Sequence, residues 1–199
     1  MKHSYRQLPK MIQQEIWINV LAIFGASILT AFITKMTGTI FNPATIAVLM
    51  VIGRMDIIPA YLIKKYPMWL KHRLLLITST LQVVTTFSFF YIEQETFIYI
   101  YTVTTLLEAV TLTAFYIDYD TVIIRMINSP DTYRDLQYME NIAFKLASAL
   151  GLGLVALTDM SCEVAVVSSG ICMAVLLGWI IRQHVTNYSN ITIEQNDVK

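Results

Sequence analysis

Three ionisable side chains lie deep inside apolar stretches of the sequence. Arg54 and Asp56 belong to residues 44–63, and Glu108 belongs to residues 97–116. A helix would place Arg54 and Glu108 ~15 Å from its ends, and an unpaired charge at that depth in a bilayer costs from ~3 to over 10 kcal/mol. Asp56 points to nearly the opposite side of the helix from Arg54. We therefore expect an interhelical pair between Arg54 and Glu108.

Two interpretations of this pair stay open. It is either a buried structural clamp, or Glu108 is a titrating carboxylate that serves a proton relay or a substrate counter-charge. Polar residues at helical spacing share the face of Glu108, and another set shares a face of the stretch 73–92. Such faces either hydrogen-bond neighbouring helices or line a wet cavity. The candidate substrate- or proton-binding residues are Arg54, Asp56, Tyr101, Thr104, Glu108 and Thr111, and the second set is Thr78, Gln82 and Thr85.

The elements that must position these residues are apolar helices. Hydrophobic residues make up 56% and charged residues 14% of the 199 residues, against roughly 45–50% and 25% in an ordinary soluble domain. Six stretches approach the ~20 residues that a helix needs to cross a bilayer. They are Ile16–Thr34, Ala44–Ile63, Arg73–Ile92, Phe97–Tyr116, Ile142–Thr158 and Val164–Ile181. The sequence therefore predicts an all-α integral membrane protein with six transmembrane helices.

Basic residues predict the orientation of these helices. Of the basic residues outside the apolar stretches, eleven fall on one side of the predicted membrane, and Lys35 alone falls on the other. Because cytoplasmic segments are enriched in Lys and Arg, we expect both termini in the cytoplasm and the protein in the plasma membrane. The predicted division is a cytoplasmic segment 1–15, a six-helix domain 16–182 and a polar cytoplasmic tail 183–199.

The connections and several local motifs resemble a known transporter family. A short basic connection, 64–73, follows the second stretch, and a longer polar segment, 116–140, separates the fourth from the fifth. The motifs are Ile57–Ala60 (IIPA), Ser129–Asp131 (SPD) and Leu146–Gly153 (LASALGLG). Together these features resemble the N-terminal six-helix half of a major facilitator superfamily transporter, in its drug and macrolide exporter branch.

This resemblance implies two three-helix repeats and the function of a transporter-like permease subunit. A chain of six helices would then need a second half, supplied by homodimerisation or by another six-helix subunit, to enclose a substrate path. The motifs are altered, because Pro59 or Ala60 replaces a glycine and Lys64 or Lys71 replaces an aspartate of the family pattern. These changes favour an alternative, a non-transporting immunity, scaffold or sensory protein that binds another membrane protein or a peptide.

Small residues at four-residue spacing predict close contacts between helices. Ala143, Ala147 and Gly151 form one such stripe, and Ala22 and Ala26 form another. The second pair also resembles the Ala-xxx-Ala surface of vitamin-binding subunits of energy-coupling-factor importers. That resemblance gives a third interpretation of the function.

Enzymatic activity is not expected. His3, His72 and His184 are scattered, no catalytic motif occurs, and we predict no catalytic residue, cofactor or metal. Cys162 and Cys172 fit packing thiols better than a redox pair. Lys plus Arg and Asp plus Glu both number 14, so nucleic acid is not an expected partner. The expected partners are the lipid bilayer and a second copy or second subunit.

Overall fold

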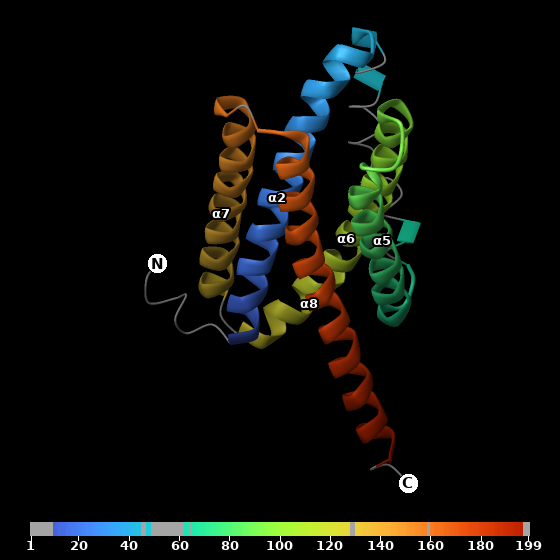
Figure 1. The fold of residues 1–199 in the computed structure, drawn as a ribbon. Coiled ribbons are helices and arrows are strands. Elements are labelled where there is room, and N and C mark those ends of the chain that lie inside the picture. The colour runs from blue at the N-terminus through green and yellow to red at the C-terminus, as the bar shows by residue number, and fades with distance from the viewer. Residues whose placement is uncertain are drawn as a thin grey trace.

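The protein is all-helical, as predicted. The computed structural model describes residues 10–44, 47–48, 62–63, 65–127, 130–158 and 160–196. Within these ranges the long helices are α2 (Lys10–Ile40), α5 (Met68–Ser88), α6 (Gln94–Ile127), α7 (Pro130–Leu157) and α8 (Cys162–Asn196) (Figure 1). Helices suit an apolar solvent because each one satisfies its own backbone N–H and C=O groups.

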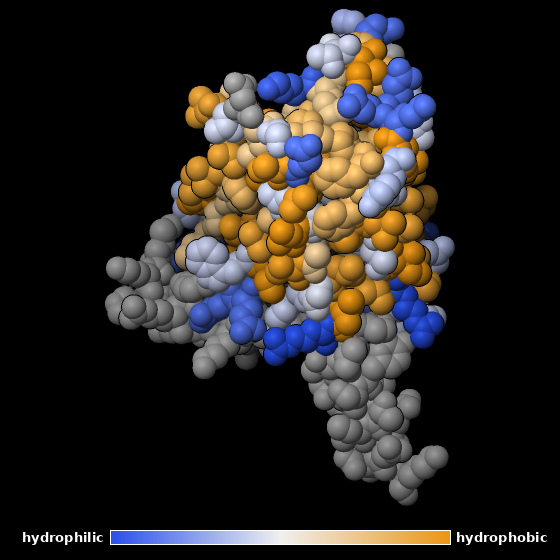
Figure 2. All heavy atoms as spheres, viewed as in Figure 1, coloured by the Kyte–Doolittle hydropathy of each residue, from blue (hydrophilic) through white to orange (hydrophobic). Residues whose placement is uncertain are grey.

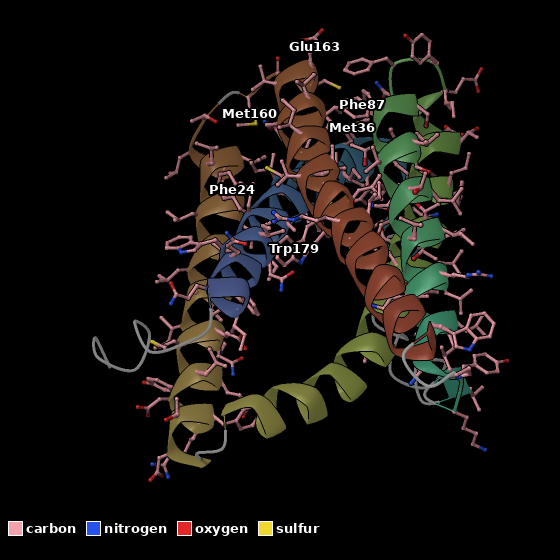
Figure 3. The ribbon with its side chains drawn as sticks, turned by 90° about the horizontal axis from the view of Figure 1, so that it is seen from below. Phe24, Met36, Phe87, Met160, Glu163 and Trp179 are labelled. Atoms are coloured by element: carbon pink, nitrogen blue, oxygen red, sulfur yellow. The ribbon has the colours of Figure 1, made fainter. Side chains whose placement is uncertain are left out.

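The helices form two groups that meet at α8. Helix α2 packs along α7 and α8, whereas α5 packs along both α6 and α8. Figure 1 shows α2, α7 and α8 side by side, with α5 and α6 as an antiparallel pair beyond α8. The second half of α6 crosses beneath the bundle toward the start of α7, which is also visible in the view from below (Figure 3).

The connections from α5 onward to α8 are short. Helix α6 ends at Ile127 and α7 begins at Pro130, a residue that suits the first position of a helix because it lacks an N–H. Most of the segment 116–140 is therefore helical, although the sequence predicted a longer connection. At the start of α8 the Ser161 hydroxyl accepts a hydrogen bond from the Val164 N–H at 3.4 Å, which caps this helix.

An aromatic chain joins the two groups of helices. Phe32 on α2 contacts Phe89 edge-on with ring centroids 6.1 Å apart, and Phe89 contacts Phe97 in the same way at 4.8 Å. Phe97 then stacks on Tyr101 of α6 at 5.8 Å. These rings belong to the largest buried apolar cluster, which also contains Ile28 and Leu29. Tyr101 is therefore held in place by the apolar core, and its hydroxyl is left for polar contacts.

The structure supports a membrane location. Three of the described helical segments are long and apolar enough to cross a bilayer, namely Ile12–Ile40, Asp131–Leu157 and Cys162–Arg182. On the face drawn in Figure 2, apolar side chains gather in a broad central belt, and hydrophilic ones gather toward its upper and lower margins. The exposed apolar residues include Leu150 and Leu157, as expected where lipid is the solvent.

The prediction of six transmembrane helices in two three-helix repeats is wrong. Three candidate spans, not six, are found in the described chain, and α2 makes its main contacts with α7 and α8. The second predicted span, Ala44–Ile63, lies mostly outside the described residues. The third and fourth predicted spans became α5 and α6, whose apolar runs are interrupted by hydroxyl, amide and carboxyl groups. The apolar content of a stretch does not show whether its polar side chains face lipid or protein. Here many of them are buried within the protein.

Candidate functional site

Polar side chains are buried where α5 and α6 pack together. We call this set the polar interface. From α5 it contains Thr78, Ser79 and Gln82, and from α6 it contains Tyr101, Thr105, Glu108 and Thr111. All are buried except Thr105, which is half-buried. A polar group in this environment is costly unless it finds a hydrogen-bond partner, so the pattern of partners decides which groups are unusual.

Three hydrogen bonds cross the polar interface between side chains. The Ser79 hydroxyl donates to the Glu108 carboxylate oxygen Oε1 at 3.2 Å, and the Gln82 Nε2 donates to the Thr105 hydroxyl at 3.0 Å. A third bond of 2.8 Å joins the hydroxyls of Thr78 and Thr111. These bonds form successive steps along the antiparallel pair, because residue numbers rise along α5 while they fall along α6.

The threonine hydroxyls also bond to their own helices. In the Thr78–Thr111 pair one hydroxyl donates to the other, and the second donates to its own helix, either from Thr78 to the Leu74 carbonyl at 3.0 Å or from Thr111 to the Glu108 carbonyl at 2.9 Å. Thr86 donates to the Gln82 carbonyl at 2.8 Å. Threonine can satisfy itself in this way without a partner helix. The carboxylate of Glu108 and the amide of Gln82 make no such bond to a carbonyl of their own helix among the described residues. These two groups therefore depend on hydrogen bonds across the interface.

Glu108 is the charged residue at the centre of the polar interface. It is only 6% exposed, and within the described part of the chain Ser79 is the side chain recorded as donating to it. Ser79 itself lies in the middle of the 21-residue helix α5. A carboxylate buried between packed helices is costly to retain for structure alone, which makes Glu108 the leading functional candidate.

The α6 residues predicted to share one face do so. Tyr101, Thr104, Glu108 and Thr111 are all buried, and Glu108 and Thr111 bond to α5 residues. The Tyr101 hydroxyl lies close to the side chains of Thr30, Gln82 and Thr105. Tyr101 therefore links the polar interface to α2.

Two residues important to this geometry were not identified from the sequence. Ser79 and Thr105 fall one position outside the helical faces that were traced through Thr78 and Thr104. Pairing α5 and α6 as an antiparallel hairpin and aligning their polar residues would have found both, because each lies opposite a residue that was selected.

Arg54 and Asp56 lie outside the described residues, so the Arg54–Glu108 pair stays a prediction. Among the described residues the exposed salt bridge between Arg134 and Asp131 has an N–O distance of 3.2 Å. It lies at the start of α7 and not in the polar interface.

Several of the predicted helix-packing residues lie at contacts between helices of the same chain. Ala147 and Ala22 are buried, whereas Ala143 and Ala26 are half-buried. Gly151 of α7 lies against α2, where an added Cβ would be 2.7 Å from the Phe24 carbonyl oxygen and 2.8 Å from the Ser27 Cβ.

Further contacts extend this packing along α2. Ser27 donates a hydrogen bond to the Ser148 hydroxyl of α7 at 3.1 Å. On the opposite side, an added Cβ at Gly25 would overlap the Cβ of Cys172 on α8. Small residues thus let α2 approach both α7 and α8 closely.

The described residues contain no group of three or more His, Cys, Asp or Glu side chains that could hold a metal. Cys162 and Cys172 are both free thiols. A transition-metal or redox centre therefore has no support in the described part of the chain. The chemistry available is that of one carboxylate, one amide and several hydroxyls.

Comparisons with known proteins add no family assignment. No family model, no curated protein and no solved structure matches this chain.

Proposed function

We propose that this protein is a subunit of a membrane permease in which Glu108 binds the transported solute or a coupling ion. The observation that carries the proposal is the burial of Glu108, which is 6% exposed and bonded to Ser79 at 3.2 Å. Ionisable residues that face the interior of a membrane bundle mark ion and substrate pathways. A purely structural contact between α5 and α6 would not need a carboxylate, because the Thr78–Thr111 bond joins the same two helices without one.

We further propose that a second copy or a second subunit completes the path. The small-residue contact at Gly151 is already used inside the chain, against Phe24 and Ser27. An assembly would therefore form through other surfaces. Cross-linking in intact membranes, with the crosslinked bands identified by mass spectrometry, tests this assembly directly. Bands containing the monomer alone at every crosslinker concentration would contradict it.

Transport can be tested before the solute is identified. Cells that express the wild-type protein, Glu108→Gln or no protein are compared by untargeted mass spectrometry of small molecules inside and outside the cell. Glu108→Gln keeps the size and hydrogen bonding of the side chain but removes its charge. We expect at least one solute whose distribution changes with the wild-type protein and returns to the empty-cell level with Glu108→Gln.

The matched control for this experiment is Thr80→Val. Thr80 lies beside Ser79 on α5 but is exposed, and its hydroxyl donates to the Leu76 carbonyl of its own helix at 2.7 Å. It should behave as the wild type. If equal amounts of wild-type and Glu108→Gln protein give solute profiles identical to those of empty cells, the permease proposal fails. A non-transporting scaffold, immunity or sensory protein would then be favoured.

A further inference from the structure

Gln82 is the second unusual group in the polar interface. Its side chain is 1% exposed, and its Nε2 donates to Thr105 at 3.0 Å. Its carbonyl oxygen Oε1 is buried and finds no hydrogen-bond partner among the residues that the structure describes. Buried amide oxygens are nearly always satisfied in native proteins. The Gln82 oxygen is therefore an acceptor that a bound ligand can satisfy.

Gln82 and Glu108 lie on adjacent steps of the helix pair. Ser79 and Gln82 are one turn apart on α5, and Thr105 and Glu108 are one turn apart on α6. The cross-helix bonds Ser79–Glu108 and Gln82–Thr105 hold these residues opposite each other. Three residues rise ~4.5 Å along a helix. A small ligand between the two steps is thus within reach of both the free Gln82 oxygen and the carboxylate.

The atoms available to this ligand are oxygens. Besides the Gln82 amide and the Glu108 carboxylate, the hydroxyls of Tyr101 and Thr105 lie next to Gln82. Carboxylate, carbonyl and hydroxyl oxygens are the donors that hard cations prefer. The residues named here contribute one formal negative charge, so a monovalent cation neutralises the site. A divalent cation would leave a net positive charge buried in the helix bundle, which is unfavourable.

We propose that a monovalent cation of the sodium type binds between Gln82 and Glu108 in the polar interface. This proposal deepens the permease function and rests on it only for the role of the cation as a coupling ion. The binding itself needs no transport. Ser79 orients the carboxylate by donating to its Oε1, which leaves the other carboxylate oxygen for the cation. Tyr101, fixed by its stacking on Phe97 at 5.8 Å, closes the side toward α2.

The test is the thermal unfolding of purified protein in detergent, with NaCl replaced by choline chloride at constant ionic strength. A ligand that binds only the folded state raises the unfolding temperature in a saturable way. We expect a rise of about 5 °C at saturating Na⁺ for a chain of this size, and a smaller one with K⁺. Gln82→Leu and Glu108→Gln should each abolish the Na⁺ dependence.

Thr80→Val is the matched control. Thr80 lies on the same helix as Gln82 but is exposed and outside the polar interface, and its hydroxyl donates to the Leu76 carbonyl at 2.7 Å, so this variant should keep the full response to Na⁺. If either site variant fails to fold, isothermal calorimetry of Na⁺ binding to the wild-type protein still tests the proposal. The absence of binding heat, or an unfolding temperature that ignores Na⁺ in the wild type, would overturn it.

Further outcomes distinguish the cation site from the Arg54–Glu108 pair and from the permease function. A wild type indifferent to Na⁺, with an Arg54→Ala variant that responds to Na⁺, would overturn the proposal because Arg54 would then fill the place of the cation. Na⁺ binding without any Glu108-dependent solute movement would keep the cation site and reject the permease. Glu108-dependent solute movement without Na⁺ binding would keep the permease and reject the cation site.

Discussion

Ser79 and Glu108 are joined across two helices by a hydrogen bond of 3.2 Å, and both are buried. The serine hydroxyl is the donor, so it stabilises the charged carboxylate and fixes its direction. This bond is the point at which α5 determines the chemistry of α6.

Ser79→Ala removes the donor and leaves the carboxylate with one hydrogen bond fewer. Hydrogen bonds to charged groups contribute about 1.5–3 kcal/mol in soluble proteins, and those between membrane helices average less, about 0.6 kcal/mol. We expect a loss of about 1–2 kcal/mol in the free energy of unfolding, measured by denaturant titration in detergent. The exposed neighbour variant Thr80→Val should change it by less than about 0.5 kcal/mol.

A double-mutant cycle isolates this contact. If the bond is made, Ser79→Ala should cost much less in a Glu108→Gln background, because the charged acceptor is already gone. Equal costs in the two backgrounds would mean that Ser79 stabilises the fold by some other contact.

Thr78 and Thr111 should contribute less than Ser79. Their hydroxyls are 2.8 Å apart, but each also lies within hydrogen-bond distance of a carbonyl of its own helix. Replacing both with valine keeps the shape and leaves no buried hydroxyl without a partner. The double variant should therefore lose no more than about 1 kcal/mol of unfolding free energy. A loss larger than that of Ser79→Ala would shift the centre of the polar interface away from Glu108.

Two glycines on α7 make a matched pair for testing the contact with α2. In Gly151→Ala the new Cβ would lie 2.7 Å from the Phe24 carbonyl oxygen, whereas at Gly153 nothing lies within 4 Å. Overpacking typically costs about 1–3 kcal/mol, so Gly151→Ala should be destabilised by that amount. Gly153→Ala should be neutral or more stable by up to about 1 kcal/mol, because alanine favours the helix. Thermal unfolding of the two variants measures the difference, and identical behaviour would contradict the α2–α7 packing.

The two ends of the bundle should lie on opposite sides of the membrane. Glu163 begins α8 at the same end as the connection between α5 and α6, while Arg134 lies at the other end, in the first turns of α7. With Cys162 and Cys172 replaced, Glu163→Cys should react with an impermeant maleimide added to intact cells. Arg134→Cys should react only after the cells are opened, because we expect segments rich in Lys and Arg on the cytoplasmic side. The opposite labelling pattern would reverse the proposed orientation.

The sequence predicted the helical class and most residues of the polar interface. Helical spacing was enough to place Tyr101, Thr104, Glu108 and Thr111 on one face, because that face is a property of α6 alone. The partners Ser79 and Thr105 depend on how α5 aligns with α6, and one chain segment read by itself does not contain that alignment. Likewise, the unsatisfied oxygen of Gln82 is a property of the packed helix pair.

The number of spans could not be obtained from apolar length alone. Residues 73–92 and 97–116 have the length of a membrane helix, but several of their polar groups are buried against each other. Average composition does not distinguish a helix that faces lipid from one that buries a polar face. For the small-residue stripe on α7, the sequence predicted a close helix contact, and Gly151 does lie close to another helix. The sequence did not indicate that this helix is α2.

Solute uptake by liposomes that contain only the purified protein is the most direct test of the central claim that Glu108 serves transport. Once a solute has been found by the comparison of cells, its uptake is measured with the wild type, Glu108→Gln and Thr80→Val at equal amounts of folded protein. The account predicts uptake with the wild type and Thr80→Val, and at least a tenfold lower rate with Glu108→Gln. Equal rates with all three proteins would contradict the account and leave Glu108 as a structural residue of the α5–α6 contact.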